Sequence, residues 1–555
     1  MSELTVLPLP AALALSALSG AALATAFPSL GWWPMAPLAA AGTALATRGR
    51  RPRTAFALGL LTGVVFFFPH LHWSGAFVGL LPWSALTLVE ALYLAAMSAA
   101  FPLAWRAPGG RAGTVTTLTG LWVAQETLRG HIPFGGFPWG RVAFSQADAP
   151  TLGYAALGGA PLVTAAVAAT GACLAVAVTA LAEARTGPPT ASRTSRLTTI
   201  ARTTAPPLLV ALVILGGGAA VPRPTLSDRT AAVAAVQGNV PRPGLDFNAE
   251  RRAVLDNHAA GTIALADQVA TGHARRPDVV LWPENSSDID PLRNPDARSV
   301  ITRATDAVGA PVLVGAILAE PLPKVSNAAI LWGPTGSATP GPGPRYVKRH
   351  PAPFAEYVPF RSFFRLFSDK VDLVRAGFAA GRTVTVMRAG PARLGPVICF
   401  EVAYDDLVRD QVRAGADLIV VQTNNATFGF TDESVQQLAM SRLRAVETGR
   451  SVAHISTVGV SALITPDGHE TTRSGHFTPQ VLQATLPLRH QQTLAVRAGA
   501  APELALGATG ILLTAWTARR TRRRHGPIPT PDTPTTTDDR QDPPDPNREP
   551  EQEQQ

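Results

Sequence analysis

The sequence predicts an α-helical membrane domain of about eight spans joined to a layered α/β domain. Apolar residues form long runs before residue 222 and again at 500–518, whereas residues 228–488 alternate short β-type runs with helical segments. Hydrophobic residues make up 46% of the 555 residues, and charged residues only 16%. This uneven distribution excludes a single soluble globular domain.

The length of the apolar runs supports the membrane domain, because a helix needs about 20 mostly apolar residues to cross a bilayer. The candidate spans are residues 8–27, 33–47, 55–72, 79–103, 113–130, 152–182, 206–222 and 500–518. A removable signal peptide is the alternative for the first span, but no basic segment precedes Leu4 and further spans follow. We therefore expect about seven helices in residues 1–227, and a return segment with the eighth helix in residues 489–518.

Arginine clusters predict the orientation in the membrane. They follow the second, fourth, sixth and eighth spans and comprise Arg48, Arg50, Arg51 and Arg53; Arg106 and Arg111; Arg185, Arg193, Arg196 and Arg202; and Arg519, Arg520, Arg522, Arg523 and Arg524. With eight spans all four clusters fall on one side, which the positive-inside rule identifies as the cytoplasm. The α/β domain is then expected to be extracytoplasmic.

The composition of the tail and the distribution of charge indicate which kinds of partner the chain can have. Residues 519–555 are basic and then rich in Pro, Thr, Asp, Glu and Gln, so we expect a disordered cytoplasmic tail, with a possible partner there. The net charge of +9 does not indicate nucleic-acid binding, because many arginines flank apolar spans.

Cys173 lies in an apolar span and Cys399 in the polar domain, which excludes a disulfide scaffold. The histidines lack ligand spacing, so we expect no metal and no cofactor.

The segment 228–488 shows the pattern of an α/β domain with buried strands. We expect strands at Val233–Val236, Val279–Trp282, Val312–Gly315, Ala328–Leu331, Gly395–Cys399, Leu418–Gln422 and His454–Val458, and helices at 249–270, 296–308, 403–414 and 432–448. Functional sites usually form where strands of such sheets end. Glu284 and Cys399 lie at or just beyond two of these ends.

A carboxylate, a cation and a thiol follow one another in this domain: Glu284, Lys348 and Cys399. A thiolate takes up acyl groups readily, and the thioester that results is readily attacked. The thiol needs a base or a nearby cation to ionise. Glu284 is the candidate base, and Lys348 is the candidate cation for the thiolate and for the oxyanion. Glu401 lies two residues beyond the cysteine, where it could orient Lys348 or Glu284.

Together with their flanking motifs, these residues resemble the apolipoprotein N-acyltransferase family, a membrane branch of the nitrilase (carbon–nitrogen hydrolase) superfamily. The matching stretches are Val236–Pro241, Leu281–Glu284, Ser326–Ala328, Tyr346–Lys348, Pro353–Pro359, Ile398–Glu401, Thr423–Gly429, Met440–Glu447, Phe137–Gly140 and Ser145–Asp148. The resemblance covers about residues 10 to 520. It implies an α-β-β-α sandwich for residues 228–488.

The resemblance also implies roles for single residues. Glu284 corresponds to the general base, Lys348 to the oxyanion-stabilising cation and Cys399 to the nucleophile. Glu356 and Glu401 correspond to supporting glutamates, and Asn327 to an asparagine of the site. The implied reaction passes an acyl chain from a phospholipid through a Cys399 thioester to the α-amine of a diacylglyceryl-cysteine at a lipoprotein N-terminus. The implied location is the outer face of a bacterial cell membrane.

Four positions depart from the family pattern. Phe400 replaces a common Tyr, Phe247 a common Trp, and Asn425 and Thr427 replace an Asp and a Trp. We expect Phe247, Phe400 and Thr427 to contact the lipid substrate.

Two other functions remain open at this point. The same three residues would serve a membrane-anchored amidase or nitrilase with water as acceptor. A non-catalytic membrane platform for a partner, such as a glycosyltransferase, is the second alternative, although it needs none of the three.

Overall fold

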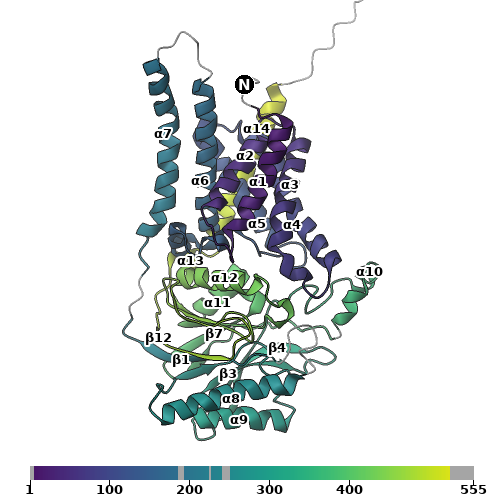
Figure 1. The fold of residues 1–555 in the computed structure, drawn as a ribbon, viewed down its shortest axis with the longest axis vertical. Helices are drawn as coiled ribbons and strands as arrows, with labels where there is room; N and C mark the ends of the chain where they lie inside the picture. The colour runs from purple at the N-terminus through teal and green to yellow at the C-terminus, as the bar shows by residue number, and fades with distance from the viewer. Residues whose placement is uncertain (1–5, 186–192, 224–226, 241–249, 375, 525–555) are drawn as a thin grey trace, which may run out of the picture.

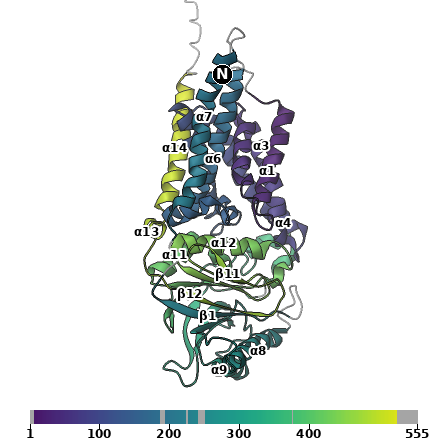
Figure 2. The same cartoon turned by 60° about the vertical axis from the view of Figure 1, so that its left-hand side comes forward.

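The computed structural model describes residues 6–185, 193–223, 227–240, 250–374 and 376–524. A bundle of helices stands on a domain of two stacked β-sheets, as two views of the ribbon show (Figure 1, Figure 2). The bundle contains α1 (Leu9–Ala26), α2 (Met35–Thr47), α3 (Pro52–His70), α4 (Leu80–Ala104), α5 (Gly110–Arg129), α6 (Ala155–Arg185), α7 (Arg193–Gly217) and α14 (Ala501–Arg524). These eight helices match the eight predicted apolar segments in order.

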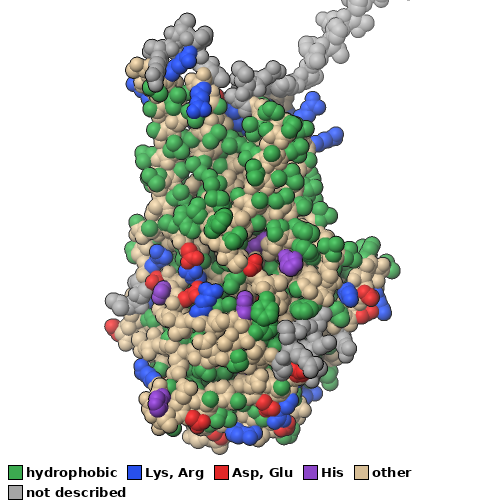
Figure 3. All heavy atoms as spheres, viewed as in Figure 1, with side chains coloured by type: hydrophobic (Ala, Val, Ile, Leu, Met, Phe, Trp, Pro, Cys, Tyr) green, Lys and Arg blue, Asp and Glu red, His purple; other side chains and the backbone are tan. Residues whose placement is uncertain are grey.

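Within the described residues, five helical segments are long and apolar enough to cross a membrane. They are α1, α3, α4, α6 with the turn before it, and α7 with the turn after it. Helix α2 is apolar but shorter, and α5 and α14 carry Glu126 and Glu503 inside the bundle. Apolar side chains cover the bundle, and Lys and Arg gather at the end away from the sheets (Figure 3). A helical membrane domain is therefore supported.

Helices α5 and α14 cross at two glycines, although 390 residues separate Gly120 from Gly510. A Cβ atom on Gly120 would lie 2.6 Å from the backbone nitrogen of Gly510, so neither position has room for a side chain. Small residues allow backbones of membrane helices to approach closely and gain packing energy. This contact holds the C-terminal helix inside the bundle.

The α/β domain contains two six-stranded sheets. The first has the order β12-β1-β2-β3-β4-β5, and the second β11-β10-β9-β8-β7-β6. The strands are β1 (Thr230–Gln237), β2 (Val279–Leu281), β3 (Val312–Leu318), β4 (Ser326–Gly333), β5 (Gly341–Val347), β6 (Met387–Ala389), β7 (Ala392–Ile398), β8 (Leu418–Thr423), β9 (Ser451–Ser456), β10 (Ala462–Ile464), β11 (Glu470–Arg473) and β12 (Gln480–Pro487). Strand β7 ends one residue earlier than predicted, because Cys399 already begins a 3₁₀ turn.

Helices cover both outer faces of the two sheets. Helices α8 (Arg251–Ala270) and α9 (Pro295–Val308) pack on the first sheet, and α11 (Asp405–Arg413) and α12 (Glu433–Thr448) on the second. A core of apolar side chains from both sheets fills the space between them. The layers are therefore α-β-β-α, the sandwich that the family resemblance implied.

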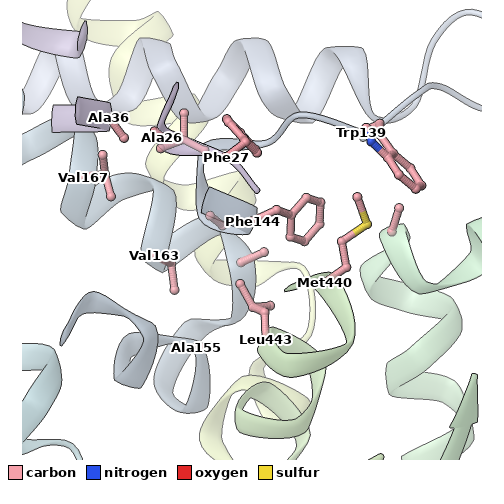
Figure 4. Close-up of a cluster of buried hydrophobic side chains, with 14 of the residues drawn as sticks. Ala26, Phe27, Ala36, Trp139, Phe144, Ala155, Val163, Val167, Met440 and Leu443 are labelled. Atoms are coloured by element: carbon pink, nitrogen blue, oxygen red, sulfur yellow. The ribbon is translucent and has the colours of Figure 1, made fainter. Parts of the chain in front are cut away.

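The face of α11 and α12 that points away from the sheet is buried against the helix bundle. One apolar core runs from α1 to β9 without interruption. Figure 4 shows its centre, where Phe144 lies between Val163 of α6 and Met440 and Leu443 of α12. The bundle and the sandwich thus share a core, which a domain anchored only by a tether does not.

An ionic network lies inside this junction. Asp405, at the start of α11, accepts from Arg141 of the loop after α5 at 2.9 Å and from Arg444 of α12 at 2.7 Å. The other members are Glu126, Arg409, Glu447 and Glu503. Burial alone would raise the pKa of Asp405, but the three arginines hold it well below its ordinary value. The carboxylate therefore stays charged and joins the two halves.

Replacing Arg444 by Met tests how much this network stabilises the fold. The side chain of Arg444 is 0% exposed, and the variant leaves Asp405 and Glu447 without one buried cation. Removal of one partner of a buried pair costs about 3–5 kcal/mol. We expect a clear drop in the thermal unfolding midpoint in detergent. Arg252→Ala, which breaks exposed ion pairs on α8, is the control and should change stability by about 1 kcal/mol or less; equal midpoints for both variants would contradict the prediction.

Candidate active site

Three residues of the first sheet place a carboxylate, an amide and an ammonium group together. Glu284 follows β2, Asn327 lies on β4, and Lys348 follows β5. The Nδ2 of Asn327 donates to Oε1 of Glu284 at 2.6 Å, and Nζ of Lys348 lies 3.4 Å from the same oxygen. All three side chains are buried, at 5%, 3% and 2% exposure. Burial raises the pKa of Glu284, although Lys348 opposes that effect.

A second carboxylate holds Lys348. Both oxygens of Glu356 lie within 3.0 Å of Nζ, and Oε2 also accepts from the backbone N–H of Ala352. Burial alone would lower the pKa of Lys348, but Glu356 and Glu284 outweigh it and raise the pKa above its ordinary value. The lysine is therefore a permanent cation between two carboxylates.

Cys399 comes from the second sheet and faces this group. It follows β7 with φ = +54°, a left-handed conformation that costs an L-residue energy and is held only by its surroundings. Cys399 is 7% exposed, and the charges of Glu284 and Lys348 both act on its thiol. Burial, and then the charge of Glu284, raise the pKa of this thiol well above its ordinary value. At neutral pH the thiol keeps its proton until a base takes it.

Glu401 ties the two sheets together behind the site. Its carboxylate accepts from the backbone N–H of Ile398 at 2.8 Å, from that of Arg349 at 2.6 Å and from the hydroxyl of Tyr346 at 2.9 Å. Among the described residues it bonds to neither Lys348 nor Glu284. It orients the lysine indirectly, since it holds the Tyr346 side chain and the Arg349 backbone, one on each side of Lys348, against the turn of Cys399.

Sequence reasoning missed a set of polar side chains on the other side of the thiol. Thr423 Oγ1 and Gln437 Nε2 each lie 3.7 Å from Sγ of Cys399. Asn425 and the fully buried Glu433 lie next to them, and burial raises the pKa of Glu433 to about 8. Thr423 ends β8 and Cys399 directly follows the parallel neighbour β7, whose Ile398 pairs with Gln422; this adjacency is the signal that could have indicated Thr423.

The three positions expected to contact the lipid substrate have different surroundings. The ring of Phe400 packs against Trp139 at 4.6 Å and Trp73 at 5.8 Å between centroids, both from the helix bundle. Thr427 is half-buried in a short 3₁₀ turn, Ala426–Phe428. Phe247 lies outside the described residues.

An apolar cleft opens beside these aromatic rings. Its volume is about 420 Å³, and it lies between the start of α4 and the loop after β8. Its walls include Phe77, Leu80, Trp83, Phe428 and Phe430. Phe428 also contacts Trp73, at 5.1 Å between ring centroids, so one aromatic cluster connects the cleft with the residue next to Cys399.

Comparisons with known proteins agree with this architecture. The family model "Apolipoprotein N-acyltransferase N-terminal domain" matches residues 19–173, and "Carbon-nitrogen hydrolase" matches residues 302–495. An amidase from Nesterenkonia sp. aligns with 50% of this chain and 96% of its own, at 18% identity and a TM-score of 0.35.

Two relatives align with nearly the whole chain, and both are named apolipoprotein N-acyltransferase. The protein of Mycolicibacterium smegmatis is 40% identical over 513 residues, which cover 89% of this chain and 82% of the relative. The protein of Ralstonia nicotianae is 30% identical over 532 residues, which cover 92% and 93%. The chain therefore belongs to the apolipoprotein N-acyltransferase family.

Proposed function

We propose that this chain N-acylates lipoproteins, with a membrane phospholipid as acyl donor and an N-terminal diacylglyceryl-cysteine as acceptor. The observation that carries the proposal is the meeting of Glu284, Lys348 and Cys399 in a sandwich whose apolar core is continuous with a bundle of membrane-type helices. The names of the relatives support N-acylation. The identity of the donor and acceptor is what the family resemblance implies, and the apolar cleft fits a lipid donor.

In the first half-reaction Glu284 takes the thiol proton, and the thiolate of Cys399 attacks an ester carbonyl of the phospholipid. The carbonyl oxygen becomes an oxyanion, which Lys348 and the backbone N–H of Phe400 stabilise. When the C–O bond breaks, Glu284 returns the proton to the departing lysophospholipid alkoxide. The acyl chain remains on the sulfur as a thioester.

In the second half-reaction the neutral α-amine of the acceptor attacks the thioester carbonyl. Glu284 takes a proton from the attacking nitrogen, and the C–S bond breaks. The products are an amide and the cysteine, which recovers its proton from Glu284. Lys348 serves the same oxyanion in both halves, which explains why two carboxylates hold it in one place.

The cleft supports a lipid rather than a water-soluble donor. Its walls are largely aromatic and aliphatic, and it lies where the sandwich meets the helix bundle. On α10 (Arg361–Phe364) and the residues after it, Phe363, Leu366 and Phe367 are more than half exposed at the same level. Such apolar surface is typical of contact with a membrane. A soluble-substrate amidase needs neither feature, and a non-catalytic platform needs no nucleophile.

We further propose eight spans, with the sandwich outside the cytoplasm of a bacterial cell. Helices α2, α5 and α14 pack among the five apolar spans, and the basic end of the bundle points away from the sheets (Figure 1, Figure 3). Positive charge marks the cytoplasmic side. The C-terminal tail beyond Arg524 lies outside the described residues, and its cytoplasmic location and possible partner remain predictions.

Intact-mass analysis tests the acyl-enzyme. Wild-type protein incubated with phospholipid should gain the mass of one acyl chain, removable by hydroxylamine, and Cys399→Ala should gain none. Lys348→Met should acylate about 10²–10³-fold more slowly, as loss of an oxyanion donor does. Addition of a diacylated lipopeptide should discharge the thioester into a triacylated product. Rapid discharge by water alone would favour a hydrolase instead.

Replacing Glu284 by Gln should separate reactivity of the thiol from turnover. After burial, the charge of Glu284 is the largest cause that raises the thiol pKa, so its removal should lower that pKa. Alkylation of Cys399 by iodoacetamide should then reach its half-maximal rate at a lower pH than in the wild type. Acyl transfer should nevertheless fall about 10²–10⁴-fold, because the general base is lost. A midpoint that stays in place would show that Glu284 does not act on the thiol.

Single cysteines test the orientation. In a background with Cys173→Ala and Cys399→Ala, we expect Arg252→Cys on α8 to react with a membrane-impermeant maleimide in intact spheroplasts. Arg106→Cys, in the turn after α4, should react only after permeabilisation. Both side chains are exposed to reagent in the folded protein. The reverse labelling pattern would overturn the extracytoplasmic placement.

A further inference from the structure

A hydrogen-bonded chain leads from the backbone to the sulfur of Cys399, and its direction can be determined atom by atom. The backbone N–H of Gly459 donates to the hydroxyl oxygen of Ser456 at 2.8 Å. The N–H of Val458 donates to the same oxygen at 3.4 Å. Backbone N–H groups can only donate, so both lone pairs of this hydroxyl are used and its own proton is directed to its remaining partner. That partner is Oδ1 of Asn425.

This contact fixes which way the amide of Asn425 points. Its oxygen accepts from Ser456, so its nitrogen faces the opposite side, where it donates to Oε2 of Glu433 and, at 3.2 Å, to Oε1 of Gln437. Glu433 is 0% exposed, and its other oxygen has no partner among the described side chains. When Glu433 is ionised both of its oxygens can only accept, which agrees with the direction set by Ser456.

The amide of Gln437 is oriented in turn. Its oxygen accepts from Asn425 and, at 2.7 Å, from the hydroxyl of Thr423. Its nitrogen is therefore directed at Sγ of Cys399, 3.7 Å away. The hydroxyl of Thr423 is equally close to the sulfur, but its single proton is used on Gln437. While that proton is on Gln437, Thr423 has none to offer the sulfur, and the amide N–H of Gln437 is the donor that remains.

We propose that Gln437 is a catalytic residue that donates an N–H to the thiolate of Cys399. A buried thiolate needs donors, because burial penalises its charge, and bonds to a charged group are the stronger ones. Glu433 and Asn425 are positioning residues that hold the amide in its orientation. The proposal rests on Cys399 acting as the nucleophile, as in the proposed function, and adds the group that stabilises its ionised state.

The neighbouring residue provides a matched control. Gln436 is also a buried glutamine of α12, but its oxygen accepts from Trp139 at 2.7 Å and its nitrogen faces His70. The two variants Gln436→Met and Gln437→Met each remove one buried amide from the same helix. Only the second removes a donor to the sulfur.

The experiment measures the rate of alkylation of Cys399 by iodoacetamide against pH, in full-length protein in detergent, with the site located by peptide mass. For Gln437→Met we expect the pH midpoint to rise by about one unit and the rate of acylation by phospholipid to fall about 10-fold. Gln436→Met should leave the midpoint unchanged. Thr423→Val should also leave it nearly unchanged, because the proposed donor remains.

Equal midpoints for folded Gln437→Met and wild type would overturn the proposal, whatever the change in stability. Should that variant not fold, Gln437→Leu decides, since its side chain is of similar size but supplies neither a charge nor an N–H. Its midpoint should rise, and an unchanged or lower midpoint would overturn the proposal. A wild type that alkylates normally but forms no thioester with phospholipid would contradict the proposed function, while the midpoints would still decide the role of Gln437.

Discussion

The carboxylate of Asp405 is the point on which the rest of the structure depends. It lies six residues beyond Cys399 and receives Arg141 from the helix bundle and Arg444 from α12. Arg444 also donates to the carbonyls of Val402 and Ala403, which belong to the turn that begins at Cys399. A charge buried in this way must stay paired, because an unpaired one is costly. The position of the proposed nucleophile is therefore fixed by the same contacts that join the bundle to the sandwich.

The site forms where two sheets meet, and each supplies what the other lacks. The first sheet contributes the acid–base group and the cation, Glu284 and Lys348, whereas the second contributes Cys399 with the donor side chains behind it. Glu401 crosses the boundary by accepting from backbone on both sides. Catalytic geometry thus depends on the packing of the sheets against each other, which the shared apolar core between them determines.

Sequence patterns predicted the central strands of both sheets but did not predict the strands at the sheet edges. Runs such as Leu418–Val421 are buried on both faces and therefore apolar, but the outer strands β5 and β12 carry Pro, Gly and polar residues, which edge positions tolerate. Helix α7 begins at Arg193, well before the predicted 206, because Pro206 and Pro207 lie within it rather than at its start. The motifs indicated Glu284, Lys348 and Cys399. Gln437 carries no local signal, since only the fold brings it to the sulfur.

The core that runs from α1 to β9 makes the helix bundle the outer layer of the enzyme's own sandwich. Bundles of this kind tilt when the bilayer becomes thinner or thicker than their apolar length. A tethered domain would not respond to such a tilt. Here Phe144 and its neighbours pack against α12, the helix that bears Gln437 and Arg444, so α12 moves with the bundle. A change in the thickness or lipid composition of the surrounding membrane is therefore expected to shift α12 relative to the thiol.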